Sequence, residues 1–340
     1  MHSLPVRQAI GCVLAHDVTR IIPGESKGPK FKKGHIIQEK DVETLLDMGK
    51  AHIYVLKLSS DQIHEDAAAQ RIAAAASGPG LKISVPSEGR VNLVTEYAGL
   101  LKVDVTALNR LNAIQDVVFA TLHGNHRVKA GQPVAGTRVI PLVVDDSLVA
   151  EAETMCRNHR PIIEVKPFRS LNVGMIVTGS EVFLGRIKDQ FGPVVEKKFK
   201  ALGSRVAHQI YVSDDIERTV DSVQSMVSEG MEMIVLTGGM SVDPDDRTAD
   251  GIRSTGAEVV TYGAPTFPGA MFMLAYIGDI PVLGLPGCVM YHRTSIFDLI
   301  VPRLTAGERL RRDDIVALGH GGFCIGCDEC RYPACAFGKV

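Results

Sequence analysis

Three short segments in the second half of the chain combine glycine with hydroxyl or acidic side chains. They are Thr178-Gly179-Ser180-Glu181, Thr237-Gly238-Gly239-Met240-Ser241 and Leu285-Pro286-Gly287-Cys288. Glycine has no Cβ, so backbone N–H groups can approach an anion, and Thr and Ser hydroxyls add further donors. The sequence contains neither a P-loop nor a GxGxxG pattern. The three segments together therefore predict a site for a phosphate-bearing ligand.

Four aspartates follow the second of these segments, namely Asp243, Asp245, Asp246 and Asp250. Aspartate directly before a helix commonly caps the free N–H groups, and we expect at least one of the four to do so. Carboxylates beside a phosphate site are also ligands that Mg²⁺ prefers. Glu181 has a similar pair of interpretations, as a solvent-facing acid or as a site residue. The pattern leaves these interpretations open.

Four of the seven cysteines lie close together near the end of the chain. Cys324, Cys327, Cys330 and Cys335 have the spacing C-x2-C-x2-C-x4-C, whereas Cys12, Cys156 and Cys288 are scattered. The first 30 residues show no secretory signal, so this cluster favours metal binding over disulfides. Four thiolates at this spacing suit either a [4Fe–4S] cluster or a structural Zn²⁺ ion. The sequence predicts a metal-binding tail and leaves the metal open.

The glycine segments lie in a region of regular alternation that begins at Leu171. The predicted strands are 172–177, 205–212, 231–236, 258–262 and 281–284, and the predicted helices are 193–202, 216–228, 246–254 and 288–304. This alternation predicts an α/β fold with a doubly wound, mostly parallel sheet and helices on both faces. Each glycine segment then follows a strand, at the carboxyl edge where open parallel sheets bind ligands.

The first half of the chain is less regular. We predict a helix from Asp41 and a strand over 52–56, then an Ala-rich helix over 60–77 and short β-prone runs between 81 and 144. This indicates a smaller α+β region before the α/β domain. The predicted boundaries are 1–57 for an N-terminal segment, 58–165 for a helix plus a small β-rich module, 166–310 for the α/β domain and 319–340 for the Cys-rich tail.

A basic loop is predicted over residues 24–35. It contains Lys27, Lys30, Lys32, Lys33 and His35. Such runs are often simply solvated, but this one is also suited to recruit oxyanions such as phosphate, including at a partner subunit's site in a dimer. Both interpretations stay open at this point.

Composition excludes several classes of protein. The 340 residues carry 37 Lys+Arg against 39 Asp+Glu, a net charge of −2, with 5% aromatic residues and no Trp. This balance argues against nucleic-acid binding. An apolar run of about 18 residues, as a membrane-spanning helix needs, is absent from the sequence. We therefore predict a cytoplasmic protein without nucleic-acid or membrane partners.

The glycine segments resemble a known family in their flanking residues. Residues 176–182, Ile-Val-Thr-Gly-Ser-Glu-Val, and 236–242, Leu-Thr-Gly-Gly-Met-Ser-Val, are similar to the molybdopterin-binding domain of molybdenum cofactor biosynthesis proteins, in particular the molybdopterin molybdenumtransferase (MoeA-type) branch. The motif 284–287, Gly-Leu-Pro-Gly, matches the third turn of that family. Residues 34–55 and the segment 8–17, which is similar to the family's opening helix, extend the resemblance upstream.

The resemblance implies an activity and a set of site residues. The reaction would be insertion of molybdate or tungstate into adenylated molybdopterin, with release of AMP. A homodimer is also implied. The implied catalytic residues are Asp246, Glu181 and Ser241, and Asp243 would join Asp246 as a ligand of Mg²⁺. The implied cofactor-binding residues are Thr178, Gly179, Ser180, Thr237, Gly238, Gly239, Pro286 and Gly287.

Some residues depart from the family pattern. Cys288 stands where the family usually has Asn, and residues 268–271 read Pro-Gly-Ala-Met where it usually has Pro-Gly-Lys-Pro. The run 245–248 also resembles the loop of CinA-type relatives, which act as nucleotide pyrophosphatases. The alternatives are therefore a non-catalytic carrier or sensor, which delivers the cofactor to a molybdo- or tungsto-oxidoreductase through the tail, or a nucleotide pyrophosphatase.

Overall fold

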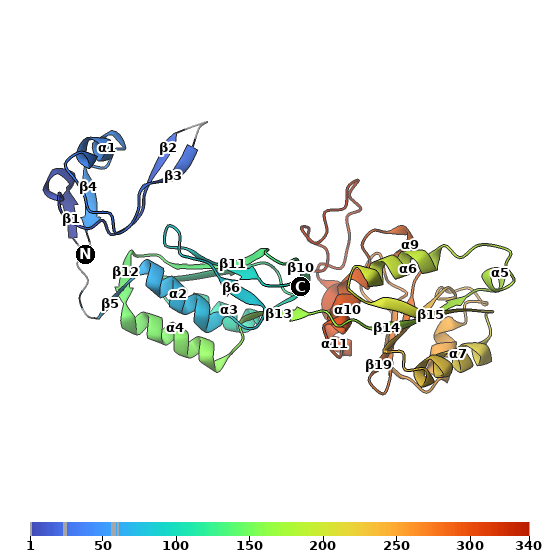
Figure 1. Ribbon diagram of the computed structural model, residues 1–340. Coiled ribbons are helices and arrows are strands. Elements are labelled where there is room, and N and C mark those ends of the chain that lie inside the picture. The colour runs from blue at the N-terminus through green and yellow to red at the C-terminus, as the bar shows by residue number, and fades with distance from the viewer. Residues whose placement is uncertain (1, 23–25, 56–58, 60, 340) are drawn as a thin grey trace. The chain divides into compact units, whose positions relative to one another are not determined.

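The computed structural model describes residues 2–22, 26–55, 59 and 61–339 (Figure 1). Contacts between Cα atoms divide the chain into two compact units. Unit 1 comprises residues 1–97, 103–122 and 129–165, and unit 2 comprises residues 98–102, 123–128 and 166–340. Among the described residues, no helix is long and apolar enough to cross a membrane.

The N-terminal part of unit 1 is formed by two strand pairs and a short helix. β1 (His2–Pro5) pairs antiparallel with β4 (His52–Val55), and β2 (Val18–Ile22) pairs with β3 (Ser26–Phe31). Helix α1 (Asp41–Asp47) begins where predicted. The opening helix expected over 8–17 is wrong, because only a 3-10 turn (Val6–Gln8) forms and Gly11 then takes a φ of 84°. The predicted basic loop is largely β3, while Gly24 and Glu25 lie outside the described residues.

The remainder of unit 1 contains three helices and mostly antiparallel strands. A four-stranded sheet has the order β6-β7-β11-β9, and β5 pairs with β12. The bounds are β5 (Gln62–His64), α2 (Glu65–Ala76), β6 (Leu81–Ile83), β7 (Val91–Thr95), α3 (Val105–Asn112), β9 (Val117–Thr121), β11 (Pro133–Val139), β12 (Val143–Asp145), α4 (Asp146–Asn158) and β13 (Ile163–Pro167). Helices α2 and α4 are joined by Arg71, which binds Glu153 at 2.8 Å.

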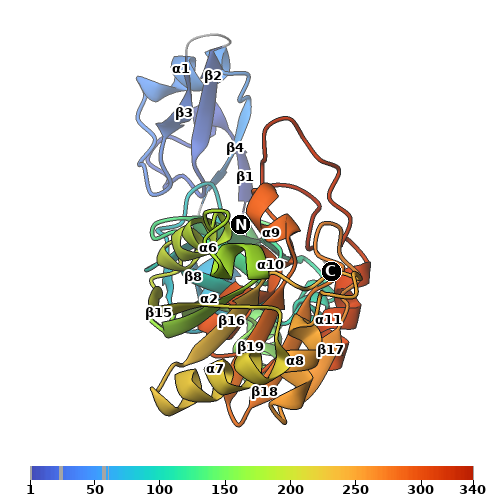
Figure 2. The same ribbon diagram turned by 90° about the vertical axis from the view of Figure 1, so that its right-hand side faces the viewer.

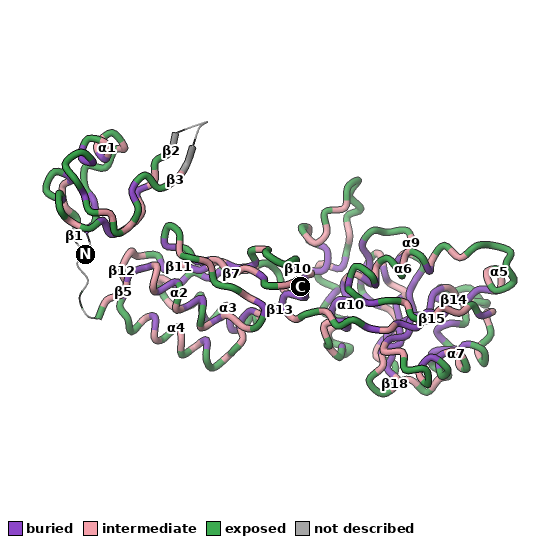
Figure 3. Tube along the Cα trace, in the orientation of Figure 1, coloured by how far each residue is buried: buried purple, intermediate pink, exposed green. Residues whose placement is uncertain are grey.

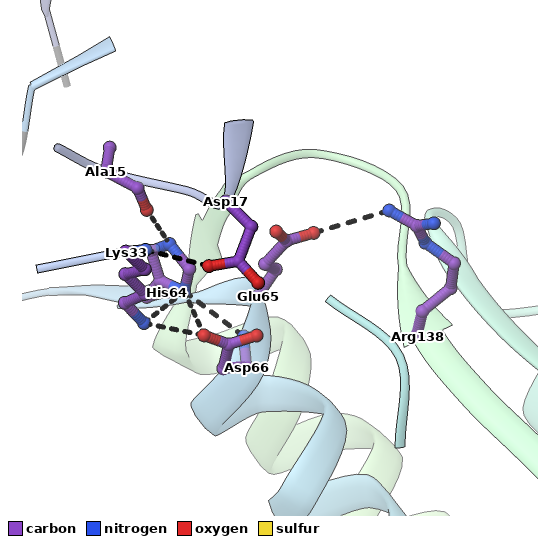
Figure 4. Close-up of polar contacts among 7 residues, drawn as sticks. All are labelled: Ala15, Asp17, Lys33, His64, Glu65, Asp66 and Arg138. Carbon is purple, nitrogen blue, oxygen red and sulfur yellow. Dashed lines mark hydrogen bonds and ion pairs between the residues drawn. The ribbon is translucent and has the colours of Figure 1, made fainter. Parts of the chain in front are cut away.

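A buried histidine in unit 1 connects the N-terminal elements to the start of α2 (Figure 4). His64 Nε2 donates to the Ala15 carbonyl oxygen at 2.5 Å, and His64 Nδ1 accepts from the Lys33 ammonium group at 2.8 Å. Lys33 Nζ also lies 2.8 Å from an Asp66 carboxylate oxygen, and the Lys33 backbone N–H donates to Asp17 at 2.7 Å. Lys33, which belongs to the predicted anion-recruiting loop, is therefore an ion-pair partner within unit 1.

This histidine makes the stability of unit 1 depend on pH. Burial, with a further contribution from the charge of Lys33, lowers the pKa of His64 below its ordinary 6.5. Below about pH 6.5 the unfolded chain binds a proton that folded His64 does not, so we expect stability to fall as the pH falls. Urea unfolding at several pH values measures the effect. His64→Asn keeps a donor and an acceptor without titrating, and should flatten the dependence relative to His52→Asn, a change at an exposed position. An equal pH dependence in both variants would contradict the prediction.

Unit 2 is built on a six-stranded sheet with the order β15-β14-β16-β19-β18-β17. β15, β14, β16 and β19 run parallel, and β18 and β17 continue the sheet antiparallel. The bounds are β14 (Asn172–Thr178), β15 (Arg205–Val212), β16 (Met233–Thr237), β17 (Glu258–Tyr262), β18 (Met273–Ile277) and β19 (Ile280–Leu285). The prediction of an α/β fold with a doubly wound, mostly parallel sheet is confirmed.

Helices cover both faces of this sheet (Figure 2). On one face Val173, Met175 and Val177 pack in a core with Phe199 of α6 and Phe297 of α10, and on the other face alternate strand residues pack against α7 and α8. Figure 3 shows β14 buried along nearly its whole length. The helix bounds are α5 (Ser180–Phe183), α6 (Phe191–Lys200), α7 (Ile216–Ser228), α8 (Thr248–Ser254), α9 (Cys288–Tyr291), α10 (Ile296–Thr305) and α11 (Arg312–Val316).

Two further strands and the Cys-rich tail complete unit 2. β8 (Gly99–Val103) and β10 (His126–Val128) pair antiparallel. The described part of the tail after residue 319 has no helix, and its one strand-like contact is a bridge between Phe323 and Phe267. Phe337 is buried in the core of the unit. The tail therefore packs on the α/β domain.

Candidate functional site

The first cavity at the carboxyl edge of the sheet lies where β14 and β16 end. Its volume is about 460 Å³. Four predicted site residues line it, Thr178, Glu181, Thr237 and Gly238. Further lining residues include Lys188 and Asp189 of the loop before α6, Phe191 at the start of α6, and Met290 and Tyr291 of α9. The cavity therefore combines aromatic and apolar walls with both signs of charge, a composition suited to a planar ring that carries a phosphate.

The ends of β14 and β16 are held together by threonine hydroxyls. The Thr178 hydroxyl donates to the Thr237 carbonyl oxygen at 3.1 Å and shares a hydrogen bond of 2.8 Å with the Thr248 hydroxyl. A Cβ at Gly238 would lie 2.1 Å from the Thr178 carbonyl oxygen, and the backbone of Gly238 has a φ of 91°. Only glycine allows this close approach of the two loops. The Thr237 hydroxyl is buried and has no hydrogen-bond partner in the described structure.

A second cavity of about 480 Å³ lies on the other side of Gly238, where β16 and β19 end. The predicted site residues on its wall are Gly238, Gly239, Ser241, Asp246, Pro286 and Gly287. Further wall residues come from the loop 267–271, including Phe267, Pro268 and Met271, and from Cys288. Because Gly238 lines both cavities, the second glycine segment forms the common wall between them.

The carboxylates of the acidic loop differ in exposure and in whether they line a cavity. Asp246 is half-buried and lines the second cavity, whereas Asp243 and Asp245 are exposed and line neither cavity. One Asp246 carboxylate oxygen accepts from the Asp243 backbone N–H at 3.3 Å, so Asp246 closes its own turn. Helix α8 begins after Arg247 without a side-chain capping hydrogen bond. None of the four aspartates therefore caps α8 with its side chain, and the expectation that at least one of them would do so is wrong.

Two predicted residues of the first glycine segment do not line the two cavities. Gly179 has a φ of 141°, and Ser180 begins the short helix α5. The Ser180 backbone N–H and hydroxyl both donate to an Asp214 carboxylate oxygen, at 2.8 and 2.9 Å. Asp214 anchors this loop to the end of β15, and we did not predict it as a site residue.

Several wall residues also were not predicted. Asp189 accepts hydrogen bonds from the Phe191 and Gly192 backbone N–H groups at 2.8 and 3.0 Å, so it caps α6 while facing the first cavity. An aspartate shortly before a helical pattern is a recognisable signal of such a cap. The sequence gives no comparable signal for Tyr291, because this residue lines the cavity only as a result of where the end of α9 packs.

The four tail cysteines are free thiols. Cys324, Cys330 and Cys335 are partly buried, and Cys327 is exposed. All four line a cavity of about 220 Å³ that is separate from the two described above. Within the described ranges, no three His, Cys, Asp or Glu side chains form a ready site for a metal ion.

Comparisons with known proteins agree with the site's location. Residues 174–306 match the family model described as "Probable molybdopterin binding domain", and residues 3–57 match a model of a domain of unknown function. All three glycine segments lie within residues 174–306. Residues 174–306 are thus similar to the molybdopterin-binding domains that this model describes.

Curated relatives match over a shorter stretch. A CinA-like protein of Mycobacterium tuberculosis is 32% identical over 92 residues, which are 27% of this chain and 21% of that protein. A CinA-like protein of Mycobacterium sp. strain JLS is 33% identical over 92 residues, 27% of this chain and 22% of that protein. The chain thus matches about a fifth of the length of these relatives.

Two solved structures show partial similarity to this chain. The molybdopterin biosynthesis enzyme MoaB from Thermus thermophilus is 17% identical with a TM-score of 0.34, covering 41% of this chain and 98% of that chain. The tungsten cofactor synthesizing protein MoaB from Pyrococcus furiosus is 20% identical with a TM-score of 0.32, covering 35% and 84%.

Proposed function

We propose that this chain acts in molybdenum cofactor biosynthesis, binding adenylated molybdopterin and inserting molybdate or tungstate with release of AMP. The observation that carries the proposal is the pair of cavities that share Gly238, within residues 174–306. A pterin joined to a nucleotide has two planar ends linked through phosphates. Two cavities with a common wall suit a ligand of that form.

In this proposal the phosphoanhydride lies at the common wall. A ligand that occupies both cavities must pass Gly238 and Gly239, where backbone N–H groups can approach phosphoryl oxygens without a Cβ in the way. Lys188 on the first cavity adds a positive charge for the phosphates. The remaining proposed contacts of the ligand are Thr178, Thr237, Pro286 and Gly287. Gly179 and Ser180, which line neither cavity, act by shaping the loop.

The residues at the second cavity are compatible with Mg²⁺. This ion is usually held by one or two carboxylates together with substrate phosphates and several waters. Asp246 supplies one carboxylate beside the proposed phosphoanhydride, and Asp243, exposed in the same turn, would contact the ion through water. When bound, Mg²⁺ would neutralise charge on the phosphoryl oxygens.

Two other side chains orient the reacting groups. Glu181 lies on the first cavity and Ser241 on the second, close in sequence to Gly179 and Gly239. Hydrolysis of the anhydride consumes one water and releases AMP. In the proposed reaction the two dithiolene sulfurs replace two molybdate oxygens, which leave as water after taking up protons. The role of the chain's residues is to position the substrates and stabilise charge.

An alternative activity is favoured by one observation. The CinA-like relatives match 92 residues of this chain, and the acidic run after the second glycine segment resembles the corresponding loop. A nucleotide pyrophosphatase would use Asp246 in the same way, without molybdate. A carrier or sensor would use both cavities and would leave the anhydride intact.

Release of AMP distinguishes these activities. The full chain is mixed with adenylated molybdopterin and Mg²⁺, with and without molybdate, and AMP is quantified. We expect release that depends on molybdate. Release of equal rate without molybdate, extended to unrelated dinucleotides, would replace the proposal by a pyrophosphatase. Tight pterin binding without any release would replace it by a carrier.

Further proposals concern the assembly and the tail. A homodimer, a cytoplasmic location, delivery of the cofactor to a molybdo- or tungsto-oxidoreductase and the four-part division at 57, 165, 310 and 319 remain predictions. Sedimentation velocity tests the dimer directly. We also keep the proposal that Cys324, Cys327, Cys330 and Cys335 bind a metal centre.

A further inference from the structure

The four thiols of the Cys-rich tail line one cavity. Cys324, Cys327, Cys330 and Cys335 all line the same cavity of about 220 Å³, although they are spread over twelve positions of a segment without helix or sheet. The cavity is also lined by residues 291–294, which comprise the end of α9 and the loop that follows it. From this arrangement we propose that the four thiols hold a [4Fe–4S] cluster, and that Zn²⁺ is not the native occupant.

The size of the space favours a cluster over a single ion. In a structural zinc site each sulfur lies about 2.3 Å from the metal, so four sulfurs close on one point and leave no cavity between them. The four thiols here instead line a cavity of about 220 Å³ together with residues 291–294 and Tyr332, and among the described residues no three Cys, His, Asp or Glu side chains are grouped as a single metal ion requires. A cubane of iron and sulfide lies between its four cysteine ligands and fills such a space.

The charges around the cavity suit an anionic cluster. Arg293 and Arg331 both line it, with one nearby acid, Asp328. The Thr294 hydroxyl lies 3.3 Å from Cys330 Sγ, a hydrogen bond of the kind that orients and tunes a ligating sulfur. Tyr332 and Phe337 form an apolar wall that limits access of water.

The tail is fixed at both ends, which restricts the segment that carries the four thiols. Phe267 N–H donates to the Gly322 carbonyl and Cys324 N–H to the Phe267 carbonyl, each at 2.8 Å. At the other end Gly338 N–H donates to the Gly321 carbonyl at 2.9 Å. A Cβ at Gly321 would lie 2.4 Å from the Lys339 carbonyl oxygen, so the two ends of the tail touch.

The thiol cavity shares wall elements with the candidate pterin site. Tyr291 lines both the thiol cavity and the first cavity. Phe267, which binds Cys324 through its backbone, lines the second cavity. The cluster is therefore placed beside the pterin cavities within unit 2. Its assignment stands on the thiol cavity alone and does not depend on the activity proposed above.

Anaerobic metal analysis tests the assignment. The full chain is purified without oxygen, incubated with ferric iron, sulfide and an excess of a thiol reductant that reduces part of the iron, and desalted; a parallel sample receives Zn²⁺ alone. We expect four irons and four acid-labile sulfides per chain, with the broad visible absorption of an iron–sulfur cluster. Stoichiometric zinc in the protein as isolated, with no uptake of iron and sulfide once that zinc is removed, would overturn the proposal.

Two matched variants show whether the tail cysteines are the ligands. Cys330→Ser should reduce iron, sulfide and visible absorption by at least half, while Cys12→Ser, at a half-buried thiol in unit 1, should leave all three unchanged. Circular dichroism establishes that each variant is folded. Cys327→Ser, at an exposed position, provides a second test should Cys330→Ser not fold. Full cluster content in the folded variants of the tail would overturn the proposal.

Discussion

Asp246→Asn is expected to reduce Mg²⁺-dependent AMP release by about 100-fold, the scale on which loss of one charge-stabilising group lowers turnover. Asp246 is the carboxylate of the acidic loop that lines the second cavity. Asparagine keeps the size of the side chain and an oxygen that can accept from Asp243 N–H, so the turn should persist. Because only the charge is removed, half-saturation should move to higher Mg²⁺ concentration. A titration of AMP release against Mg²⁺ measures both effects.

Asp245→Asn is the matched control for this prediction. It makes the same change of charge in the same loop, at an exposed side chain that lines neither cavity. We expect a change of less than about threefold, because exposed charges are screened by solvent and salt. An equal loss in the two variants would mean that the loop acts through its total charge. Full activity of Asp246→Asn would remove Asp246 from the mechanism.

Much of unit 2 could be predicted because local pattern and tertiary environment agree there. The predicted helix 216–228 and strands 205–212 and 258–262 have the bounds of α7, β15 and β17. The strand β18 was missed, since the alternation of strand and helix led us to expect no hairpin between β17 and β19. The signal was the short turn Gly278-Asp279 between two apolar runs.

The predicted long helix 288–304 shows how a local signal can be overlooked. It is interrupted after Tyr291, and α10 begins at Ile296. The Ser295 backbone N–H donates to the Asp298 carboxylate at 3.0 Å, which is half of a capping box with the sequence pattern Ser-x-x-Asp. Apolar periodicity runs through this break, so periodicity alone could not reveal it. The break matters, because its loop forms a wall of the thiol cavity.

The candidate site was predictable only where it consists of sequence-local loops. The second glycine segment and Asp246 lie together on one cavity wall because they are neighbours along the chain. Lys188 and Tyr291 reach the first cavity from separate loops, and their approach depends on how α6 and α9 pack. Lys33 illustrates the converse, since its type indicated an anion site while its position places it against His64 and Asp66.

Arg303→Met is expected to lower the free energy of unfolding of unit 2 by about 3–5 kcal/mol, the usual cost of removing one partner from a buried ion pair. Arg303 in α10 is 8% exposed. It binds Glu308 at 2.9 Å and Asp314 at 2.6 Å, and Lys102 of β8 binds Glu308 at 2.7 Å. Methionine fills a similar volume but leaves two carboxylates short of a cation. Thermal and urea unfolding, compared with the wild type, measure the loss.

Arg253→Met supplies the control, because its pair with Asp250 is exposed. That pair should contribute at most about 1 kcal/mol, even with the Tyr262 ring beneath the guanidinium group.

The dependence of the stability loss in Arg303→Met on pH separates the ion-pair effect from a packing effect. Burial opposes ionisation of Glu308, but Lys102 and Arg303 outweigh it and lower its pKa.

A lowered pKa means that the stabilisation by Glu308 is present above its ordinary value of 4.5 and is lost as the pH falls through the folded value. In Arg303→Met the part of that stabilisation that comes from Arg303 is absent at neutral pH, while Lys102 still pairs with Glu308. The difference in stability between wild type and variant should therefore shrink as the pH falls below about 4.5. A difference that stays constant over this range would show that Arg303 stabilises the unit by packing rather than by charge.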